Sequence, residues 1–365
     1  MDLTRITPFR QLARVYSALL GIHESLLYLQ PDKQRGRQRA HEFLRSEYSD
    51  PSDSDFPLEL AHDLSVLKQR LTNLETDIEG RIARSVREHL YLPQPSNWSA
   101  NKPFLPYSTC SAADFIHPRY AEICRILDHR VQFHRKLWEW VFIYHHLEQA
   151  GVLRPGMRGL GFGVGQERLP AVFAARGAKI VATDAPSDVG LLNGWSETGQ
   201  HSDDIAQLKY PNLVSDAAFE ANVSHRYCDM NAIRADLTGF DFAWSACCFE
   251  HLGSLEAGMQ FVINSVENTL KPGGVAVHTT EYNLASNSET IANGHTVLYR
   301  QRDMEELVRR LSERGHQVQP FFVAPDSHFL DFYVDLPPYA DEPSLKIKFG
   351  DFITTSVGLV VRRRA

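Results

Sequence analysis

The sequence predicts an α/β protein with a doubly wound, mostly parallel β-sheet, preceded by a helical N-terminal region. Three observations support this fold class. A glycine-rich turn at residues 159–167 separates an apolar strand from an apolar helix. A second strand ends in the acidic residue Asp184. Strands then alternate with helices as far as residue 361, which is the pattern of a parallel sheet covered by helices.

The N-terminal region is predicted to be helical over residues 1–95, with a polar, proline-containing linker at 48–57. After the linker, apolar residues recur at alternating spacings of 3 and 4, at Leu64, Leu67, Leu71, Leu74 and Ile78. This is coiled-coil spacing, although it covers only about two heptads. Two alternatives stay open: a short coiled coil that joins subunits into a homo-oligomer, and an amphipathic helix that packs on its own domain.

Residues 96–130 are predicted to form a proline-rich bridge and lid, and residues 131–365 the main domain. A helix is expected over 118–151, and it carries Trp138 and Trp140. The first strand is expected to end near Leu160. The later strands are expected at residues 179–183, 223–228, 240–246, 274–279, 318–323 and 353–361, with a helix at 302–314 before the sixth strand.

The spacing of the glycines predicts which nucleotide the turn holds. A dinucleotide fingerprint requires glycine at the first, third and sixth positions, and neither register of this turn supplies the sixth. No Gly-Lys-Ser/Thr follows, so the turn is not a P-loop. The alternating Gly161, Gly163 and Gly165 suit a ligand without a pyrophosphate, such as S-adenosylmethionine (SAM).

Five motifs occur in order along residues 130–365. They are Gly161-Phe-Gly-Val-Gly165 with Asp184, then Asp229, Phe240-Asp-Phe-Ala-Trp-Ser245, Phe249-Glu-His-Leu252 and Leu270-Lys-Pro-Gly-Gly274. Together they resemble the class I (Rossmann-like) SAM-dependent methyltransferases. The resemblance implies a seven-stranded sheet with its seventh strand inserted antiparallel, and methyl transfer from SAM. It departs from the family at Gly159, where many members carry an acidic residue; Glu167 is a possible substitute.

The resemblance also implies which residues contact the cofactor. Gly161, Phe162, Gly163 and Gly165 would line the methionine and ribose portion, and Asp184 would accept both ribose hydroxyls. Asp229 and Met230 would meet the adenine, with capping of the next segment as the alternative role for Asp229. Trp138 is a candidate wall residue, with a place in the core as the alternative.

Methyl transfer from a sulfonium needs alignment of the nucleophile and, for a hydroxyl acceptor, removal of a proton. Three residues are candidates for the base. His251 ranks first because histidine titrates near neutrality and follows the fourth strand. Glu281 ranks second and His278 third, since a histidine inside a strand is often a satisfied core residue. These three could also hold a divalent metal, but no metal is expected.

The composition of the chain limits which binding partners, structural sites and cellular compartment we expect. The formal net charge of −7 argues against nucleic acid as the main partner. The five cysteines include no Cys-x-x-Cys pair, which argues against a zinc site or disulfide framework. The start of the chain lacks the features of a signal peptide, and its apolar runs are too short to span a membrane, so we expect a cytoplasmic enzyme.

By exclusion, the expected acceptor is a hydroxyl of a small molecule or glycan. The alternatives are an N-methyltransferase acting on an amine or a protein side chain, and a SAM-binding assembly protein without turnover. A nicotinamide-dependent oxidoreductase is disfavoured by the missing sixth-position glycine.

Overall fold

The computed structural model describes residues 65–70, 72–74, 77, 81, 85, 90–94, 100–185 and 205–365. The chain divides into two compact units, Met1–Leu74 and Glu75–Ala365. In the described part of the heptad segment, Leu67 and Leu74 are helical and exposed. The other heptad positions lie outside the described residues, so the coiled coil stays a prediction.

From residue 112 onward, the second unit contains three helices, the last two of which replace the single helix predicted over 118–151. They are α4 (Ala112–Ile116), α5 (Pro118–Ile126) and α6 (Arg135–Gln149). The break has two local causes. Asp128 adopts a positive φ of 50°, and the ring of His134 accepts a hydrogen bond from the backbone N–H of Lys136 and so caps α6. The predicted lid contributes to the core, because Phe115 and Tyr120 are fully buried.

The α/β part follows in the predicted order. Its first half contains β1 (Arg158–Phe162), α7 (Leu169–Ala175), β2 (Lys179–Asp184), η4 (Ile205–Leu208), α9 (Asp216–Asn222), β3 (Val223–Tyr227) and β4 (Phe240–Ala246). Its second half contains η5 (Phe249–His251), β5 (Gly253–Ser254), α10 (Leu255–Asn264), η6 (Ser265–Thr269), β6 (Leu270–Asn283), β7 (Asn293–Gly294), α11 (Gln301–Glu313), β8 (Gln317–Val318), η7 (Phe329–Asp331), β9 (Ile347–Phe349) and β10 (Phe352–Arg362).

The main sheet has the strand order β3-β2-β1-β4-β6-β10-β8, with β9 paired to β10. Strands β1, β2, β3, β4 and β6 pair in parallel, whereas β10 runs antiparallel to β6 and β8. The described sheet therefore has eight strands rather than seven, because the short β9 adds to the predicted set. The antiparallel insertion that the resemblance implied is present at β10.

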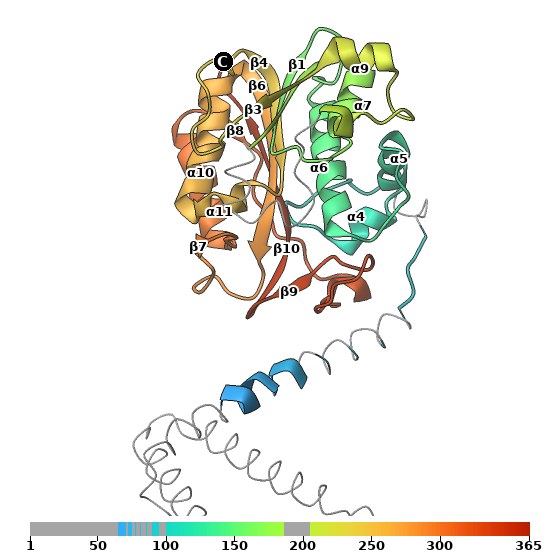
Figure 1. Ribbon diagram of the computed structural model, residues 1–365, viewed down its shortest axis with the longest axis vertical. Coiled ribbons are helices and arrows are strands. Elements are labelled where there is room, and N and C mark those ends of the chain that lie inside the picture. The colour runs from blue at the N-terminus through green and yellow to red at the C-terminus, as the bar shows by residue number, and fades with distance from the viewer. Residues whose placement is uncertain are drawn as a thin grey trace, which may run out of the picture. The chain divides into compact units, whose positions relative to one another are not determined.

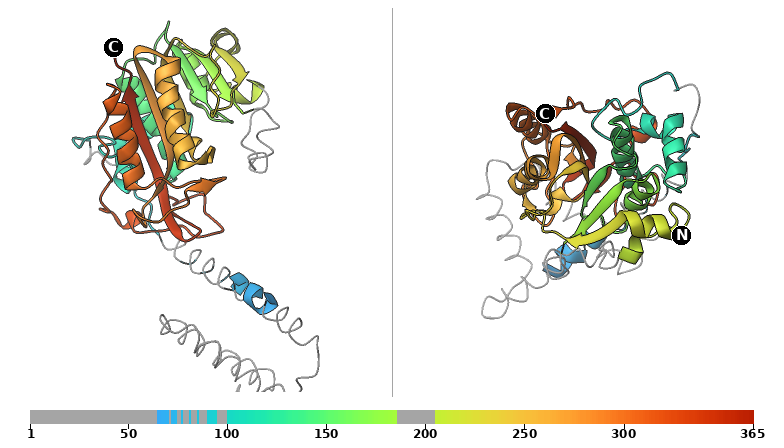
Figure 2. Two further views of the ribbon diagram at one scale, coloured as in Figure 1. Left: turned by 90° about the vertical axis from the view of Figure 1, so that its left-hand side faces the viewer. Right: turned by 90° about the horizontal axis from the view of Figure 1, so that it is seen from above.

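Helices cover both faces of the sheet, as predicted for a doubly wound fold. In Figure 1, α4 to α7 lie on one side of the sheet and α10 and α11 on the other, and the view from above shows the same two layers (Figure 2). Alternate residues of the strands enter two separate cores: Phe242 and Trp244 face the α6–α7 layer, and Leu160 and Phe162 face the α10–α11 layer. Within the described residues, none of the helices combines the length and hydrophobicity of a membrane span.

Candidate functional site

The glycine turn lies at the carboxyl end of β1. Gly163 and Gly165 have positive φ values of 57° and 47°, a conformation that residues with a side chain rarely adopt. A Cβ on Gly163 would also lie 2.7 Å from the sulfur of Cys248. Both glycines are therefore required by the backbone of the turn, which places main-chain N–H groups at this edge of the sheet.

Gly159 and Gly161 have a different role. A Cβ on Gly161 would lie 2.5 Å from the Trp244 ring, and one on Gly159 would lie 2.3 Å from the Phe242 ring. The two rings stack on each other and fill the space above β1. The prediction that Gly161 makes room for a ligand is therefore corrected, because it makes room for Trp244. The same packing explains why an acidic side chain at position 159 is excluded.

Asp184 lies at the carboxyl end of β2, the strand next to β1. Its carboxylate accepts hydrogen bonds from the N–H of Gly165 at 3.1 Å and of Ala185 at 2.9 Å. The side chain is buried. These contacts hold a carboxylate against the glycine turn, where the ribose role predicted for it requires it to be.

Glu167, the predicted substitute for the family's acidic residue, lies just beyond the turn and is buried. Its carboxyl accepts a hydrogen bond from the Trp244 indole N–H at 2.5 Å. Burial outweighs that hydrogen bond and raises the pKa of Glu167 to about 8. A carboxyl that is largely neutral in the free protein would ionise when a positive ligand group binds beside it, so its role toward the methionine amino group stays a prediction.

Glu167→Gln is expected to flatten the dependence of stability on pH. A carboxyl whose folded pKa lies above its ordinary value stabilises the fold fully below pH 4.5, and that stabilisation is lost as pH rises toward 8. The free energy of unfolding of the wild type should therefore fall relative to the variant between pH 5 and pH 8, by roughly 3.5 kcal/mol. Urea unfolding at both pH values measures this difference, and Glu305→Gln on the exposed face of α11 is the control. Parallel pH profiles for wild type and Glu167→Gln would contradict the assignment.

The end of β3 lies beside the same turn. Met230 is buried, and its sulfur lies 3.7 Å from the position of a Cβ on Gly163. Asp229 is half-buried and accepts a hydrogen bond from the N–H of Asn231 at 2.8 Å. This contact matches the capping alternative for Asp229, so the adenine roles of both residues stay predictions.

Two adjacent cysteines follow β4, and their side chains reach two different places. The Cys248 sulfur lies 3.2 Å from the carbonyl oxygen of Gly163 in the turn. The Cys247 sulfur lies 3.6 Å from a carboxylate oxygen of Glu281 at the end of β6. Cys247 has a positive φ of 51°, which is unfavourable for a residue with a Cβ. Burial raises the pKa of both thiols well above the ordinary value, so both are neutral.

Of the three candidates for the base, only His251 is at the edge of the sheet with its ring partly accessible; its side chain is 29% exposed. Its Nδ1 lies 2.8 Å from the carbonyl oxygen of His295. Because a carbonyl oxygen only accepts, Nδ1 carries the hydrogen in the neutral ring and Nε2 is then the basic nitrogen. His251 stays the leading candidate.

His278 is a core residue. It is fully buried within β6, and its two ring nitrogens lie 2.8 Å and 2.9 Å from the hydroxyls of Ser245 and Ser265. Burial lowers its pKa to about 3, which leaves the ring neutral at working pH. The prediction that His278 is a candidate base is therefore corrected.

Glu281 is held in a buried ion-pair cluster. Its carboxylate accepts from Arg135 at 2.5 Å, from Lys136 at 3.2 Å and from the hydroxyl of Thr354 at 3.2 Å. Although burial alone would raise it, the pKa of Glu281 is lowered to about 2 by the charges of Arg135 and Lys136 and by their hydrogen bonds. A carboxylate with so low a pKa is a poor base at neutral pH. The prediction of Glu281 as a base is corrected to that of a counter-ion.

Two predicted cofactor contacts also lie in the core. Trp138 is fully buried, donates its indole N–H to Asp114 at 2.9 Å and packs on Phe142. Phe162 is fully buried and packs edge-on against Phe261 of α10. Their side chains therefore support the two cores.

The sequence did not identify two buried carboxylates near Cys247, Glu139 and Glu250. Glu139 is buried in α6, where it accepts from the hydroxyls of Thr279 at 3.1 Å and Ser356 at 2.5 Å. Glu250 is fully buried in η5. In the sequence, Glu139 stands between two tryptophans, and Glu250 stands between Phe249 and His251. A carboxylate flanked by aromatic residues in this way is the pattern that could have indicated burial.

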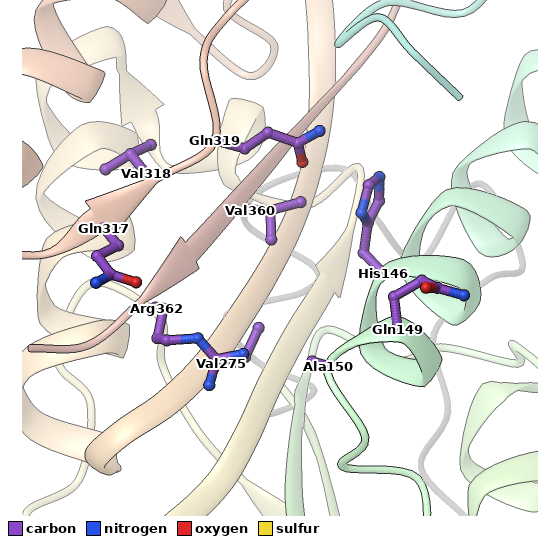
Figure 3. A pocket seen from close by; sticks show the side chains of 9 residues that line it. All are labelled: His146, Gln149, Ala150, Val275, Gln317, Val318, Gln319, Val360 and Arg362. Carbon is purple, nitrogen blue, oxygen red and sulfur yellow. The ribbon is translucent and has the colours of Figure 1, made fainter. Parts of the chain in front are cut away.

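A cavity of about 320 Å³ lies elsewhere on the domain (Figure 3). His146 and Gln149 at the end of α6 line it, together with Val275 near the start of β6 and Arg362 at the end of β10. These residues lie at the edge of the sheet where the parallel strands begin. Ligands of doubly wound sheets bind at the opposite edge, where the strands end, so this cavity is not the candidate site.

The strand order and the site together decide the fold. The glycine turn and Asp184 lie at the ends of adjacent central strands, and a single long strand, β10, is inserted antiparallel beside β6. This is the class I methyltransferase fold. No protein-family model and no curated protein matches the chain.

Solved structures of methyltransferases resemble it at low identity. The 1,6-didemethyltoxoflavin-N1-methyltransferase of Burkholderia thailandensis, with bound 1,6-didemethyltoxoflavin and S-adenosylhomocysteine, is 16% identical; 64% of this chain and 80% of that chain are covered, with a TM-score of 0.34. The phosphoethanolamine N-methyltransferase 2 of Haemonchus contortus, in complex with SAM, is 13% identical, with 69% and 57% covered and a TM-score of 0.39. A TehB-like SAM-dependent methyltransferase of Corynebacterium glutamicum is 14% identical, with 67% and 96% covered and a TM-score of 0.33.

Proposed function

We propose that the protein transfers a methyl group from SAM to a polar group of a small molecule or glycan. One observation carries the proposal: the carboxylate of Asp184 is hydrogen-bonded to the N–H of Gly165 in the turn. A carboxylate and main-chain N–H groups are thereby held together at the ends of adjacent parallel strands, which is where this fold class binds nucleosides. No pyrophosphate-binding glycine is present, which favours SAM over a dinucleotide.

The chain's residues take distinct parts in this function. Asp184, whose carboxylate is held by the N–H of Gly165, accepts the ribose hydroxyls, and the turn at Gly163 faces the rest of the nucleoside. Met230 packs on the adenine. Glu167 receives the methionine amino group, whose positive charge would favour ionisation of its carboxyl. The helical N-terminal region would join subunits or dock the acceptor.

Calorimetry tests the cofactor assignment. SAM is expected to bind the full chain, and NADH is not. Binding of NADH without binding of SAM would replace this function with a nicotinamide-dependent one. If SAM binds but labelled methyl is transferred to no component of a cell extract, the non-enzymatic alternative, a SAM-binding assembly protein, is favoured.

The acceptor is either a hydroxyl, as the sequence favoured by exclusion, or an amine. These acceptors make different demands on the site. A hydroxyl keeps its proton until transfer and needs a base beside it. An amine arrives as an ammonium ion, so it needs a counter-charge and a route by which one proton leaves before its lone pair can attack.

His251→Ala is expected to lower turnover by about 100-fold or more while leaving the SAM dissociation constant within about threefold. The reason is that a positioned base contributes to the transition state and not to cofactor binding. Turnover is measured as labelled methyl transferred from SAM into a cell extract, and SAM affinity by calorimetry. Equal losses of turnover and affinity would make His251 a cofactor residue.

A further inference from the structure

Near Cys247, the positive charges of Arg135 and Lys136 neutralise the negative charges of two carboxylates, Glu139 and Glu281. Lys136 Nζ lies 3.2 Å from Glu281 and 3.4 Å from Glu139, and Arg135 Nη1 lies 2.5 Å from Glu281 and 3.8 Å from Glu139. Arg135, Glu139 and Glu281 are buried, and the side chain of Lys136 is partly exposed. These four residues form a closed set of ion pairs with no charge left over.

Glu250 is the carboxylate that this set leaves uncompensated. Its side chain is fully buried, and one oxygen, Oε2, accepts a hydrogen bond from the hydroxyl of Thr280 at 2.9 Å. The other oxygen, Oε1, has no hydrogen-bond partner among the described residues. Among the described residues, Oε1 forms an ion pair with His251 when that ring is protonated; the Nε2 of His251 lies 3.8 Å away. A buried carboxylate oxygen with no donor is costly unless something else supplies one.

The position of Glu250 puts it beside the cofactor turn. One of its oxygens, one oxygen of Glu281 and the sulfur of Cys247 all lie within 4.8 Å of one another. Cys247 is adjacent in the chain to Cys248, whose sulfur touches Gly163 of the turn at 3.2 Å, and adjacent Cα atoms are about 3.8 Å apart. Cys247, whose backbone has a strained positive φ, thus links the Glu250–Glu281 cluster to the glycine turn that Cys248 contacts. A group bound at Glu250 would therefore lie near the end of β4, which also contacts the turn to which the proposed function assigns the cofactor.

A metal ion does not suit this cluster. Both oxygens of Glu281 are engaged, Oε1 by Arg135 and Lys136 and Oε2 by Thr354. The thiol of Cys247 is neutral, because burial raises its pKa. A divalent ion at Cys247, Glu250 and Glu281 would face two fixed cations and one free carboxylate. The missing partner of Glu250 is better supplied by a single positive charge that carries hydrogen-bond donors.

We propose that Glu250 binds the ammonium group of an amine acceptor, so that the protein is an N-methyltransferase. This inference rests on the proposed function. The ammonium donates one N–H to Oε1 of Glu250 and loses one proton through His251, whose basic Nε2 is 3.8 Å from that oxygen. The nitrogen lone pair then forms the N–C bond, the S–C bond breaks, and its electron pair stays on sulfur as S-adenosylhomocysteine. The methylated ammonium releases its extra proton to solvent.

The test compares wild type with Glu250→Gln, in both cases saturated with S-adenosylhomocysteine. The probe is methylammonium chloride, with sodium chloride and tetramethylammonium chloride at equal ionic strength as controls, because the latter cation has no N–H. Methylammonium is expected to raise the unfolding midpoint of the wild type by about 2 °C at several times its dissociation constant. The controls and the variant should show no rise. The variant should fold, because glutamine keeps the shape and removes a buried charge.

The following results would contradict an amine site at Glu250. No rise in wild type, or the same rise in Glu250→Gln, would overturn the amine site. An O-methyl product from labelled SAM in a cell extract would also overturn it and would leave the proposed function intact. Failure of the wild type to bind SAM would instead overturn the proposed function; methylammonium added to the ligand-free protein would then still report on Glu250 alone.

Discussion

Arg135→Ala is expected to lower the free energy of unfolding by about 3 kcal/mol, the cost of leaving a buried carboxylate without its main counter-ion. Arg135 is buried, and its guanidinium lies 2.5 Å from Glu281. Lys136 remains 3.2 Å from the same oxygen, so the loss should lie at the lower end of the range for broken buried pairs. Urea unfolding at pH 7 measures it.

The pH dependence of this loss identifies its origin. Because the folded pKa of Glu281 is lowered from 4.5 to about 2, the stability it contributes is present above pH 4.5 and is lost as pH falls toward 2. The difference between wild type and Arg135→Ala should therefore shrink over that interval. Arg309→Ala, which removes an exposed arginine paired with Glu306, is the control and should have little effect because water screens that pair. Equal effects of the two variants would show that Arg135 contributes no buried ion pair.

Much of the fold could be predicted because it depends on local patterns. The strand at 240–246 and the helix at 302–314 agree with β4 and α11 to within about one residue. The predicted ends of helices and strands were wrong where tertiary contacts determine them. Strand β6 extends to Asn283 because its far half pairs with β10, and the helix predicted over 118–151 is broken at Asp128, whose positive φ no apolar periodicity reveals.

The candidate site could be predicted only in part, for a related reason. The positive-φ glycines and Asp184 follow from chain order, since a turn and the end of the next parallel strand meet at one edge of the sheet. The role of Gly161 could not be read, because the ring that fills its space belongs to Trp244 on another strand. The ion pair between Arg135 and Glu281 could not be predicted either, because the two residues are 146 positions apart in the sequence. Spacing shows which residues share an element, but not which charges neutralise one another across elements.

Asp184→Asn is expected to weaken SAM binding by about 2 kcal/mol, or about 30-fold in the dissociation constant, because an ionised acceptor of two ribose hydroxyls is replaced by a neutral amide. Asp241→Asn is the matched control. Asp241 also accepts a backbone hydrogen bond, from the N–H of Arg158 at 2.8 Å, but it lies at the opposite edge of the sheet. Calorimetry with SAM should show the loss in Asp184→Asn alone.

A second ligand separates contact with the ribose from damage to the turn, since Asp184 also holds the N–H of Gly165. S-adenosylhomocysteine and its 2′-deoxyribose analogue should differ in affinity for the wild type and bind Asp184→Asn almost equally, because the variant no longer distinguishes the hydroxyl. If the analogue loses the same affinity in both proteins, Asp184 does not contact the 2′-hydroxyl. In that case its carboxylate acts only by fixing the turn, and the ribose must be held by other groups at the ends of β1 and β2.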